Sequence, residues 1–288
     1  MHNAYVVLKM PYVTFDGTGQ ERTGNKLIQY LTCKVISRVF GHIYSPLMCE
    51  DAVLVKEDEF AQMLKDRPYY LGYVNIRIVG LFQQSSFFIP YRKALLDMVY
   101  NPLNEDYWTL VTGERIYVKN LVKDVPFVHA SAGAGHDATL DDATLEENVF
   151  MSLRLDDFMH DPWHPKSDIP YASYYINILA TLSFKNLYII CDTVRYEWEL
   201  KYIQQFSKWK PTLLQESFEH DCSLMRNCKR LIHSNSSLCW VMSFLSRREK
   251  KRHIPNTRFY KEQCLEAIES SDVVYYPQTM KHDELKSL

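Results

Sequence analysis

The chain has 288 residues, 47% of them hydrophobic, which is enough for two domains with buried cores or for one large domain. Its formal net charge of -2, with a pI near 6.6, disfavours a general nucleic-acid-binding protein, which would usually be more basic. We interpret the one sustained basic run, RREKKRH at 247–253, as the solvated end of the preceding helix, where cations suit the helix dipole.

The cysteines and the apolar runs bear on the cellular setting. There are seven cysteines, an odd number, and no two of them form a CxxC pair. Because most lie in apolar segments, we expect reduced core thiols rather than disulfides or a zinc site. No apolar run reaches the roughly 18 residues of a membrane span, and the N-terminus lacks the basic region of a signal peptide. We therefore expect a soluble, cytoplasmic protein without a transmembrane segment.

Hydrophobic periodicity in the first half of the chain predicts alternating strands and helices. The strands are expected at 4–10, 42–45 and 74–81, the helices at 26–40 and within 86–100, and a further apolar alternation at 107–117. The loop at 15–25, FDGTGQERTGN, holds three glycines and could cradle a phosphate, although its spacing is not a nucleotide fingerprint. A strand, a glycine loop, a helix and a second strand begin a doubly wound α/β domain.

A segment of low apolar content separates the two halves of the chain. Residues 127–142 read FVHASAGAGHDATLDD, which is typical of a connection between domains or of a loop at their cleft. We therefore predict an N-terminal domain at 1–125, a linker at 126–145 and a C-terminal domain at 146–288.

The second half repeats the α/β alternation and ends in a polar turn. Strands are expected at 148–153, 186–191, 212–215 and 230–232, and helices at 171–182, 197–208, 219–228 and 238–245. The turn Ser234–Ser237, Ser-Asn-Ser-Ser, could serve only as a helix cap. It could also aim N–H groups and hydroxyls at an anion, which the helix dipole favours.

Polar residues follow two more of these strands, Arg154 after the first and Asp192 after the second. The carboxyl ends of parallel strands meet at one end of a sheet, where open α/β sheets bind their ligands. Arg154 offers a planar charged fork for phosphate oxygens, and the serine turn offers neutral donors. We therefore predict a phosphate-containing ligand at this end of the sheet.

Four separated segments resemble one enzyme family. RTGNKLIQYL at 22–31 and GLFQQSSFF at 80–88 resemble the GxGNQxFQYA and GYFQSxxYF segments of the alpha-1,2-fucosyltransferases. VFMSLRLDDF at 149–158 resembles the HxRxGDY motif of the alpha-1,2-, alpha-1,6- and protein O-fucosyltransferase superfamily. DCSLMRNCKRLIHSNSSLCWVMSF at 221–244 is similar to the DxxLMxxCxxxIxxNSTFSWW block of the alpha-1,2 enzymes. The segments occur in family order and span nearly the whole chain.

The resemblance implies an inverting, metal-independent glycosyltransferase of the GT-B architecture, in which two Rossmann-like domains face each other. The first domain is then on the acceptor side, and the second binds the nucleotide sugar. Such an enzyme needs no cofactor besides the nucleotide-sugar donor, and its acceptor is a glycan. Matching positions imply that Arg154 holds the β-phosphate and that Ser234, Ser236 and Ser237 form the donor-binding turn. They also imply that Asp221 lies near the guanine and Asp192 near the nucleoside. Asn25 would face the reacting sugar.

The chain departs from the family motif at three positions. Ser152 stands where the motif has histidine, Leu155 where a second arginine is common, and Asp156 where glycine is usual. One phosphate contact is thereby lost and one negative charge is added. GDP-fucose is the first donor we predict. The alternatives are xylose, rhamnose or galactose from another nucleotide, or a catalytically inactive nucleotide-sugar-binding protein.

For the general base that such a transfer needs, we predict Asp157, with His160 and Asp161 as alternatives. Asp157 could instead only orient Arg154 as its ion-pair partner. Tyr171, Tyr174 and Tyr175 could stack on a sugar, but their helical spacing is also that of a core. Without a signal anchor, such an enzyme suits a bacterial or virus-encoded protein of the cytoplasm. The acceptor and the oligomeric state are not readable from the sequence.

Overall fold

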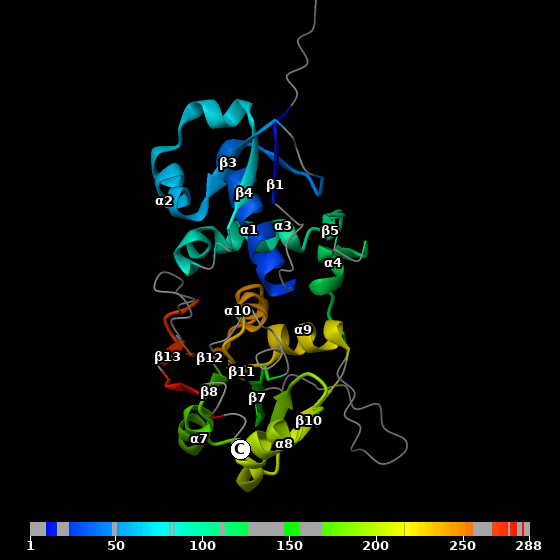
Figure 1. The fold of residues 1–288 in the computed structure, drawn as a ribbon, viewed down its shortest axis with the longest axis vertical. Coiled ribbons are helices and arrows are strands. Elements are labelled where there is room, and N and C mark those ends of the chain that lie inside the picture. Colours follow the sequence, from blue (N-terminus) through cyan, green and yellow to red (C-terminus); the bar gives the residue numbers. More distant parts are fainter. Residues whose placement is uncertain are drawn as a thin grey trace, which may run out of the picture. The chain divides into compact units, whose positions relative to one another are not determined.

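The protein is described here by a computed structural model, which covers residues 10–15, 23–47, 51–80, 82, 84–109, 113–125, 147–155, 169–215, 217–255, 267–275, 277–280 and 284 (Figure 1). The chain divides into two compact units. The first comprises Met1–Phe82 and Ser86–Lys119, and the second comprises Gln83–Ser85 and Asn120–Leu288. The linker predicted at 126–145 and nearly all of the strand predicted at 4–10 lie outside the described residues.

The first unit is built on a four-stranded parallel sheet with the strand order β2-β1-β4-β3. Its strands are β1 (Tyr12–Phe15), β2 (Ile43–Tyr44), β3 (Ala52–Lys56) and β4 (Asn75–Val79). The crossovers are α1 (Thr23–Phe40), between β1 and β2, and α2 (Glu57–Asp66), between β3 and β4. Phe15, which we expected to open the glycine loop, is instead the last residue of β1.

Smaller elements complete this part of the chain. They are the 3-10 helices Tyr69–Tyr73 and Ile89–Tyr91, α3 (Arg92–Val99), and the antiparallel pair β5 (Tyr107–Thr109) and β6 (Arg115–Tyr117). The division between the units falls within the 3-10 helix Ser85–Phe87 and within α4 (Val118–Leu121). The helices predicted at 26–40 and within 86–100 are confirmed as α1 and α3.

Among the regular strands and α-helices of the first unit, β3 and α2 had no prediction. In β3, Val53 and Leu54 are both partly exposed, at 39% and 46%, because β3 is the edge strand of its sheet. The strand therefore lacks the alternation of apolar and polar residues by which half-buried strands are found. Helix α2 buries only Phe60 and Met63 and is otherwise mostly polar. Helix α2 does carry a helical signal, because Phe60, Met63 and Leu64 recur at the spacing of one helix face, and the sequence analysis missed it.

The second unit is built on a six-stranded parallel sheet with the order β10-β9-β7-β11-β12-β13. Its strands are β7 (Val149–Ser152), β9 (Leu187–Ile190), β10 (Thr212–Leu214), β11 (Arg230–Ile232), β12 (Lys251–Pro255) and β13 (Val273–Tyr275). Counted along the chain, this order is 3-2-1-4-5-6, that of the Rossmann fold. The order reverses between β7 and β11, which is the switch point of the sheet.

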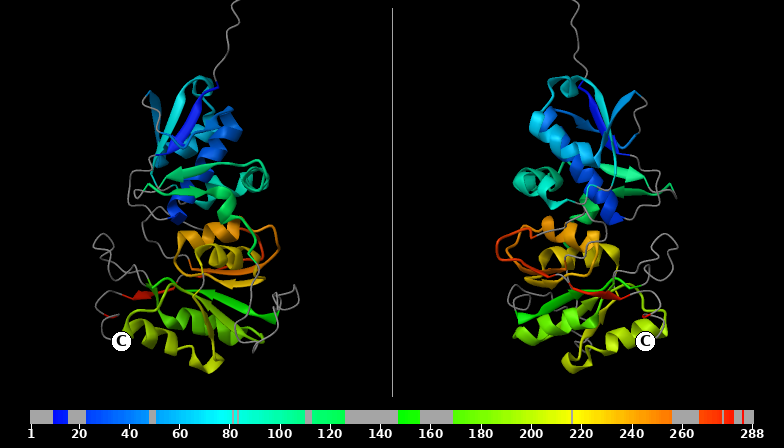
Figure 2. Two further views of the ribbon diagram at one scale, coloured as in Figure 1. Left: turned by 90° about the vertical axis from the view of Figure 1, so that its right-hand side faces the viewer. Right: turned by 60° about the vertical axis from the view of Figure 1, so that its left-hand side comes forward.

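Helices cover both faces of this sheet. They are α7 (Ala172–Thr181), α8 (Glu197–Gln204), α9 (Phe218–Asn227) and α10 (Ser237–Phe244), with a 3-10 helix at Ser207–Trp209. Figure 2 shows α7 and α8 on one face and α9 and α10 on the other. The short strands β8 (Ile169–Pro170) and β14 (Thr279–Met280) form a separate antiparallel pair. The predicted α/β class is confirmed, because both units have parallel sheets with helical crossovers.

The interpretation of the basic run 247–253 as a solvated helix end was wrong. Helix α10 ends at Phe244, and the last three residues of the run lie in β12, between β11 and β13. Arg252 is fully buried there, and its Nη1 lies 3.0 Å from Asp272 Oδ1 and 3.2 Å from Glu269 Oε2. The buried arginine is thus neutralised by carboxylates that lie in a later part of the chain.

Lys250, just before β12, is also buried. Its Nζ donates a hydrogen bond to the carbonyl oxygen of Met225 at 2.7 Å. That carbonyl is in the last turn of α9, where a cation satisfies a free acceptor and suits the helix dipole. Lys250 therefore stabilises the end of α9 from the interior, whereas the rest of the run ends no helix.

Candidate functional site

Three predicted site residues follow three neighbouring strands of the second unit. Strand β7 ends at 152, β9 at 190 and β11 at 232, so Arg154, Asp192 and Ser234 each lie two residues beyond a strand. These strands are parallel and adjacent in the order β9-β7-β11. Because neighbouring parallel strands run in the same direction, all three residues follow the strands at the same end of the sheet. The structure thus brings them to one end of the sheet.

A hydrogen bond joins the two strands at the switch point. The hydroxyl oxygens of Ser152, the last residue of β7, and Ser234 lie 3.1 Å apart, and both side chains are buried. Ser152 stands where the fucosyltransferase motif that this segment resembles has histidine. Its small hydroxyl allows this direct contact between the ends of β7 and β11.

The turn after β11 also caps α10. Ser236 is the N-cap residue, with extended backbone angles, and its side chain accepts a hydrogen bond from the backbone N–H of Cys239 at 3.5 Å. The Ser236 N–H donates to the Ser234 carbonyl oxygen at 2.9 Å, which keeps the turn tight. Ser237 is the first residue of the helix. Capping and anion binding are compatible here, because one cap bond leaves the positive end of the helix dipole at the switch point.

The body of α10 is held rigidly in the core. From Cys239 to Phe244 every residue of the helix is buried, and Trp240 stacks on Phe244 with ring centroids 5.2 Å apart. His233, in the turn, lies with Nε2 3.0 Å from the Ser243 hydroxyl. Burial lowers the pKa of His233 well below its ordinary value, so this ring is neutral at physiological pH. The helix and the turn before it are therefore fixed together.

Two predicted donor-binding acids lie close to one buried thiol. Asp192 is exposed beyond β9, and Asp221 is partly buried in α9. Burial, together with the charges of Asp192 and Asp221, raises the pKa of the Cys191 thiol to about 12. Both carboxylates therefore lie near enough to the Cys191 thiol to act on it through their charge. Their predicted contacts with the nucleoside and the base stay predictions.

The remaining predicted residues are not brought to this site by the described structure. Asp157, the predicted base, lies outside the described residues, as do its alternatives at 160 and 161. Asn25 lies near the start of α1 in the first unit and is partly buried. Tyr174 and Tyr175 are core residues, 6% and 1% exposed, so they offer no wall for a sugar.

Three further properties of the described residues concern metal ligands, cysteines and membrane-spanning helices. In this part of the chain, no group of three or more histidine, cysteine or acidic side chains is arranged to hold a metal ion. Its five cysteines are free and buried, as the sequence predicts. Its helices include none with the length and apolar character to cross a membrane.

Comparisons with known proteins give only distant likenesses. No protein-family model and no curated protein sequence matches this chain. It is similar to a structure of the E. coli heptosyltransferase WaaC with ADP, at 13% identity over 96% of this chain and 93% of that chain, with a TM-score of 0.33. A structure titled E. coli heptosyltransferase WaaC with ADP-2-deoxy-2-fluoro heptose is similar at 14% identity, over 95% of each chain, with the same TM-score. Scores this low carry no argument about function, and the fucosyltransferase resemblance gains no support from them.

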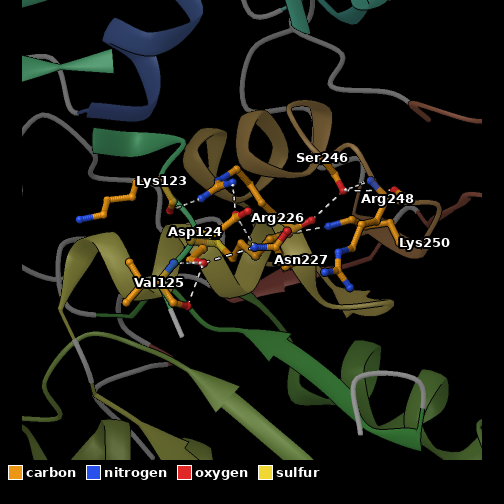
Figure 3. A network of polar contacts seen from close by, with 10 residues as sticks. Lys123, Asp124, Val125, Arg226, Asn227, Ser246, Arg248 and Lys250 are labelled. Carbon is orange, nitrogen blue, oxygen red and sulfur yellow. Dashed lines mark hydrogen bonds and ion pairs between the residues drawn. The ribbon is translucent and has the colours of Figure 1, made fainter. Parts of the chain in front are cut away.

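A buried anchor that the sequence analysis missed holds α9, the helix that carries Asp221 (Figure 3). Arg226 is 1% exposed, and its guanidinium donates to Asp124 Oδ1 at 3.0 Å and to the Lys123 carbonyl oxygen at 2.6 Å. The Val125 N–H donates to the Ser223 hydroxyl at 2.9 Å. The start of the second unit is thereby tied to α9.

Only one of the two residues of this ion pair could be recognised from the sequence. Arg226 is visible as a cation in an otherwise half-apolar helix, but Asp124 is 102 residues away and lies in a segment without periodicity. No local pattern could pair the two residues.

Proposed function

We propose that this chain is an inverting glycosyltransferase that binds a nucleotide sugar at the switch point of its second unit and transfers the sugar to a glycan hydroxyl. One observation carries the proposal: Arg154 and the Ser234–Ser237 turn both follow the strands between which a Rossmann strand order reverses. Sheets of this kind bind nucleotides at that point. Arginine and a helix N-terminus are two groups well suited to hold a diphosphate.

The proposed chemistry follows from these groups. The bond between the anomeric carbon and the diphosphate oxygen breaks, and the acceptor oxygen bonds to the opposite face of the sugar. Arg154 and the positive end of α10 stabilise the charge on the leaving diphosphate. Asp157 takes the proton of the acceptor hydroxyl as general base. No metal is needed in this scheme, because the cationic groups neutralise the phosphates.

The donor we propose first is GDP-fucose. A carboxylate such as Asp221 suits the N1 and N2 donors of guanine, and its position near Cys191 supports a place beside the nucleotide site. Xylose, rhamnose or galactose from another nucleotide remain the alternatives, because Leu155 stands where the resemblance leads one to expect a second arginine. Free buried thiols among the described residues support a reducing, cytoplasmic setting.

Thermal unfolding in the presence of nucleotides tests the proposal. GDP, UDP, dTDP and ADP are added separately to the wild type, to Arg154→Ala and to Arg230→Ala. Arg230 is the matched control, because it begins β11 and so lies at the opposite end of the sheet. A ligand at a hundred times its Kd adds about 2.7 kcal/mol to the free energy of unfolding.

We expect at least one nucleotide to raise the melting temperature of the wild type and of Arg230→Ala, but not of Arg154→Ala. GDP alone would favour fucose, and UDP or dTDP would favour another donor. The absence of any shift would refute a nucleotide site. Release of the nucleoside diphosphate from its sugar donor then separates an enzyme from a binding protein that has lost catalysis.

A further inference from the structure

The chain takes an unusual course just after β4, in the first unit. Gly80 has φ 139°, and Phe82 has φ 54°. Positive φ is uncommon for residues other than glycine, and for a bulky aromatic residue it is a true outlier. Such backbone strain persists only where the surroundings enforce it, and it is concentrated at functional sites.

Aromatic packing enforces the conformation of Phe82. Its side chain is fully buried, with its ring centroid 5.3 Å from that of Phe60 in an edge-to-face contact and 6.5 Å from that of Phe87. Phe60 belongs to α2, so this contact joins the start of α2 to the end of β4. The packing of Phe82 against Phe60 and Phe87 thus holds the strained turn in place.

Two polar side chains meet at Gly80. The side-chain amide of Gln29, in α1, donates from Nε2 to the Gly80 carbonyl oxygen at 2.7 Å. Glu57, the first residue of α2, also lies beside Gly80, since a Cβ placed on Gly80 would lie 3.1 Å from Glu57 Cβ and 3.3 Å from its Oε2. Glycine is the residue that leaves room for this approach and tolerates this φ.

Each of these side chains has a buried oxygen with no hydrogen bond. They are Gln29 Oε1 and Glu57 Oε1, which have no partner in the part of the chain that the structure describes. Gln29 is 2% exposed. Its amide cannot be turned around, because Oε1 would then face the Gly80 carbonyl oxygen, another acceptor. Buried acceptors without donors are costly, and a ligand that supplies donors would relieve the cost.

We propose that Gln29, Gly80 and Glu57 form a binding site for the hydroxyl groups of a sugar, in the first unit and separate from the nucleotide site of the second. Both unpaired atoms are acceptors, so the ligand must donate hydrogen bonds, and a phosphate or carboxylate does not fit. Hydroxyls and ammonium groups both donate. The choice of hydroxyls rests on the proposed function, in which the acceptor is a glycan.

Saturation-transfer NMR on the full chain tests this site with four free sugars: glucose, galactose, N-acetylglucosamine and glucosamine. Glu57→Ala and Gln29→Met remove the two acceptors. Asp58→Ala is the matched control for the first, because Asp58 is the next acidic residue of the same helix turn and is exposed. Gln62→Met is the control for the second, because Gln62 is an exposed glutamine of α2. Melting temperatures establish that each variant is folded.

We expect one or more of the neutral sugars to bind the wild type, and its Kd to rise tenfold or more in Glu57→Ala and Gln29→Met but not in the controls. Binding that is equal in all five proteins, or no sugar binding to the wild type, overturns the proposal. Binding of glucosamine alone overturns the choice of hydroxyls over ammonium.

Nucleotide binding, measured in the same samples, separates this inference from the proposed function. If nucleotides bind and no sugar depends on Glu57, this inference fails and the proposed function stands. If sugars bind in a Glu57-dependent manner and no nucleotide binds, the proposed function fails and the sugar site stands.

Discussion

The hydroxyl oxygens of Ser152 and Ser234 lie 3.1 Å apart, although 82 residues separate these serines in the chain. Ser152 ends β7 and Ser234 follows β11, so the bond crosses the switch point of the Rossmann sheet. Connections leave the sheet in opposite directions from these two strands, which opens a crevice between them. The bond therefore lies at the base of the proposed phosphate site.

Ser152→Ala should weaken the contact between the ends of β7 and β11 without unfolding the protein. The Ser234 hydroxyl loses its partner while it stays buried, so we expect the free energy of unfolding to fall by about 1 kcal/mol. Urea unfolding measures the loss, and Ser207→Ala, at an exposed serine of the same unit, is the control. A nucleotide that binds the wild type should bind Ser152→Ala more weakly, because the turn is less well fixed. A variant as stable as the wild type would mean that the bond does not matter.

Asp124→Asn should lower stability at neutral pH but not in acid. Burial tends to raise the pKa of Asp124, but hydrogen bonds from Asn227 and Arg226 outweigh it and hold the pKa below the ordinary 3.8. The carboxylate therefore stabilises the folded protein fully above about pH 3.8, and this stabilisation is lost as the pH falls through the folded-state pKa. We expect about 1 kcal/mol near neutrality, because the side chain of Asp124 is largely exposed. Urea unfolding of both proteins from neutral to acid pH measures the difference in their free energies of unfolding. A difference that persisted in acid would contradict this role of the carboxylate.

Comparison with Lys250→Met should show that the buried lysine lowers the free energy of unfolding less as the pH rises. Burial, together with the charges of Arg252 and Arg226, lowers the pKa of Lys250 from 10.5 to about 8. Between these two pKa values the unfolded chain binds the proton and the folded chain does not, so the wild type gains stability with rising pH. The gain relative to Lys250→Met should reach roughly 3 kcal/mol.

Chemical denaturation from pH 8 to 10.5 measures this gain. Other groups titrate alike in both proteins, so they cancel in the difference. Lys251→Met, at the exposed neighbouring lysine, should show no such trend. A constant difference between the wild type and Lys250→Met would show that the lysine stays charged.

Gly80→Ala should destabilise the first unit by more than about 1 kcal/mol, because alanine is strained at φ 139° and its Cβ would press on Glu57. Gly72→Ala is the matched control. A Cβ there would have only the Phe40 carbonyl oxygen within 4 Å, at an ordinary 3.7 Å. Thermal unfolding of both variants measures the effect. Equal stability would mean that the turn after β4 readily relaxes and is not held under strain.

The elements that the sequence predicted well are those with a local signal. Helix α1 repeats apolar residues on one face, and the buried strands β7 and β9 are continuous apolar runs bounded by polar residues. These patterns need only neighbouring residues to be recognised. Of the elements without a prediction, β3 is an edge strand with exposed apolar residues, which hides its pattern. Helix α2 does have an apolar face with Phe60 and Met63, which the sequence analysis overlooked.

Charge gave the most misleading signal. The run at 247–253 has the composition of a solvated surface, and its Arg252 is nevertheless fully buried. What makes burial possible is a pair of carboxylates, Glu269 and Asp272, that reach the guanidinium from a later segment. Since an isolated buried charge is prohibitively costly, the location of an arginine depends on partners that no local pattern displays.

The sequence by itself determined the α/β class, most of the helices and strands, and the fact that Arg154, Asp192 and Ser234 each follow a strand. Only the tertiary structure decided that β9, β7 and β11 are neighbours, and hence that these three residues gather at one end of the sheet. The physical reason is that periodicity reports which face of an element is buried, whereas strand order is set by pairing between segments tens of residues apart.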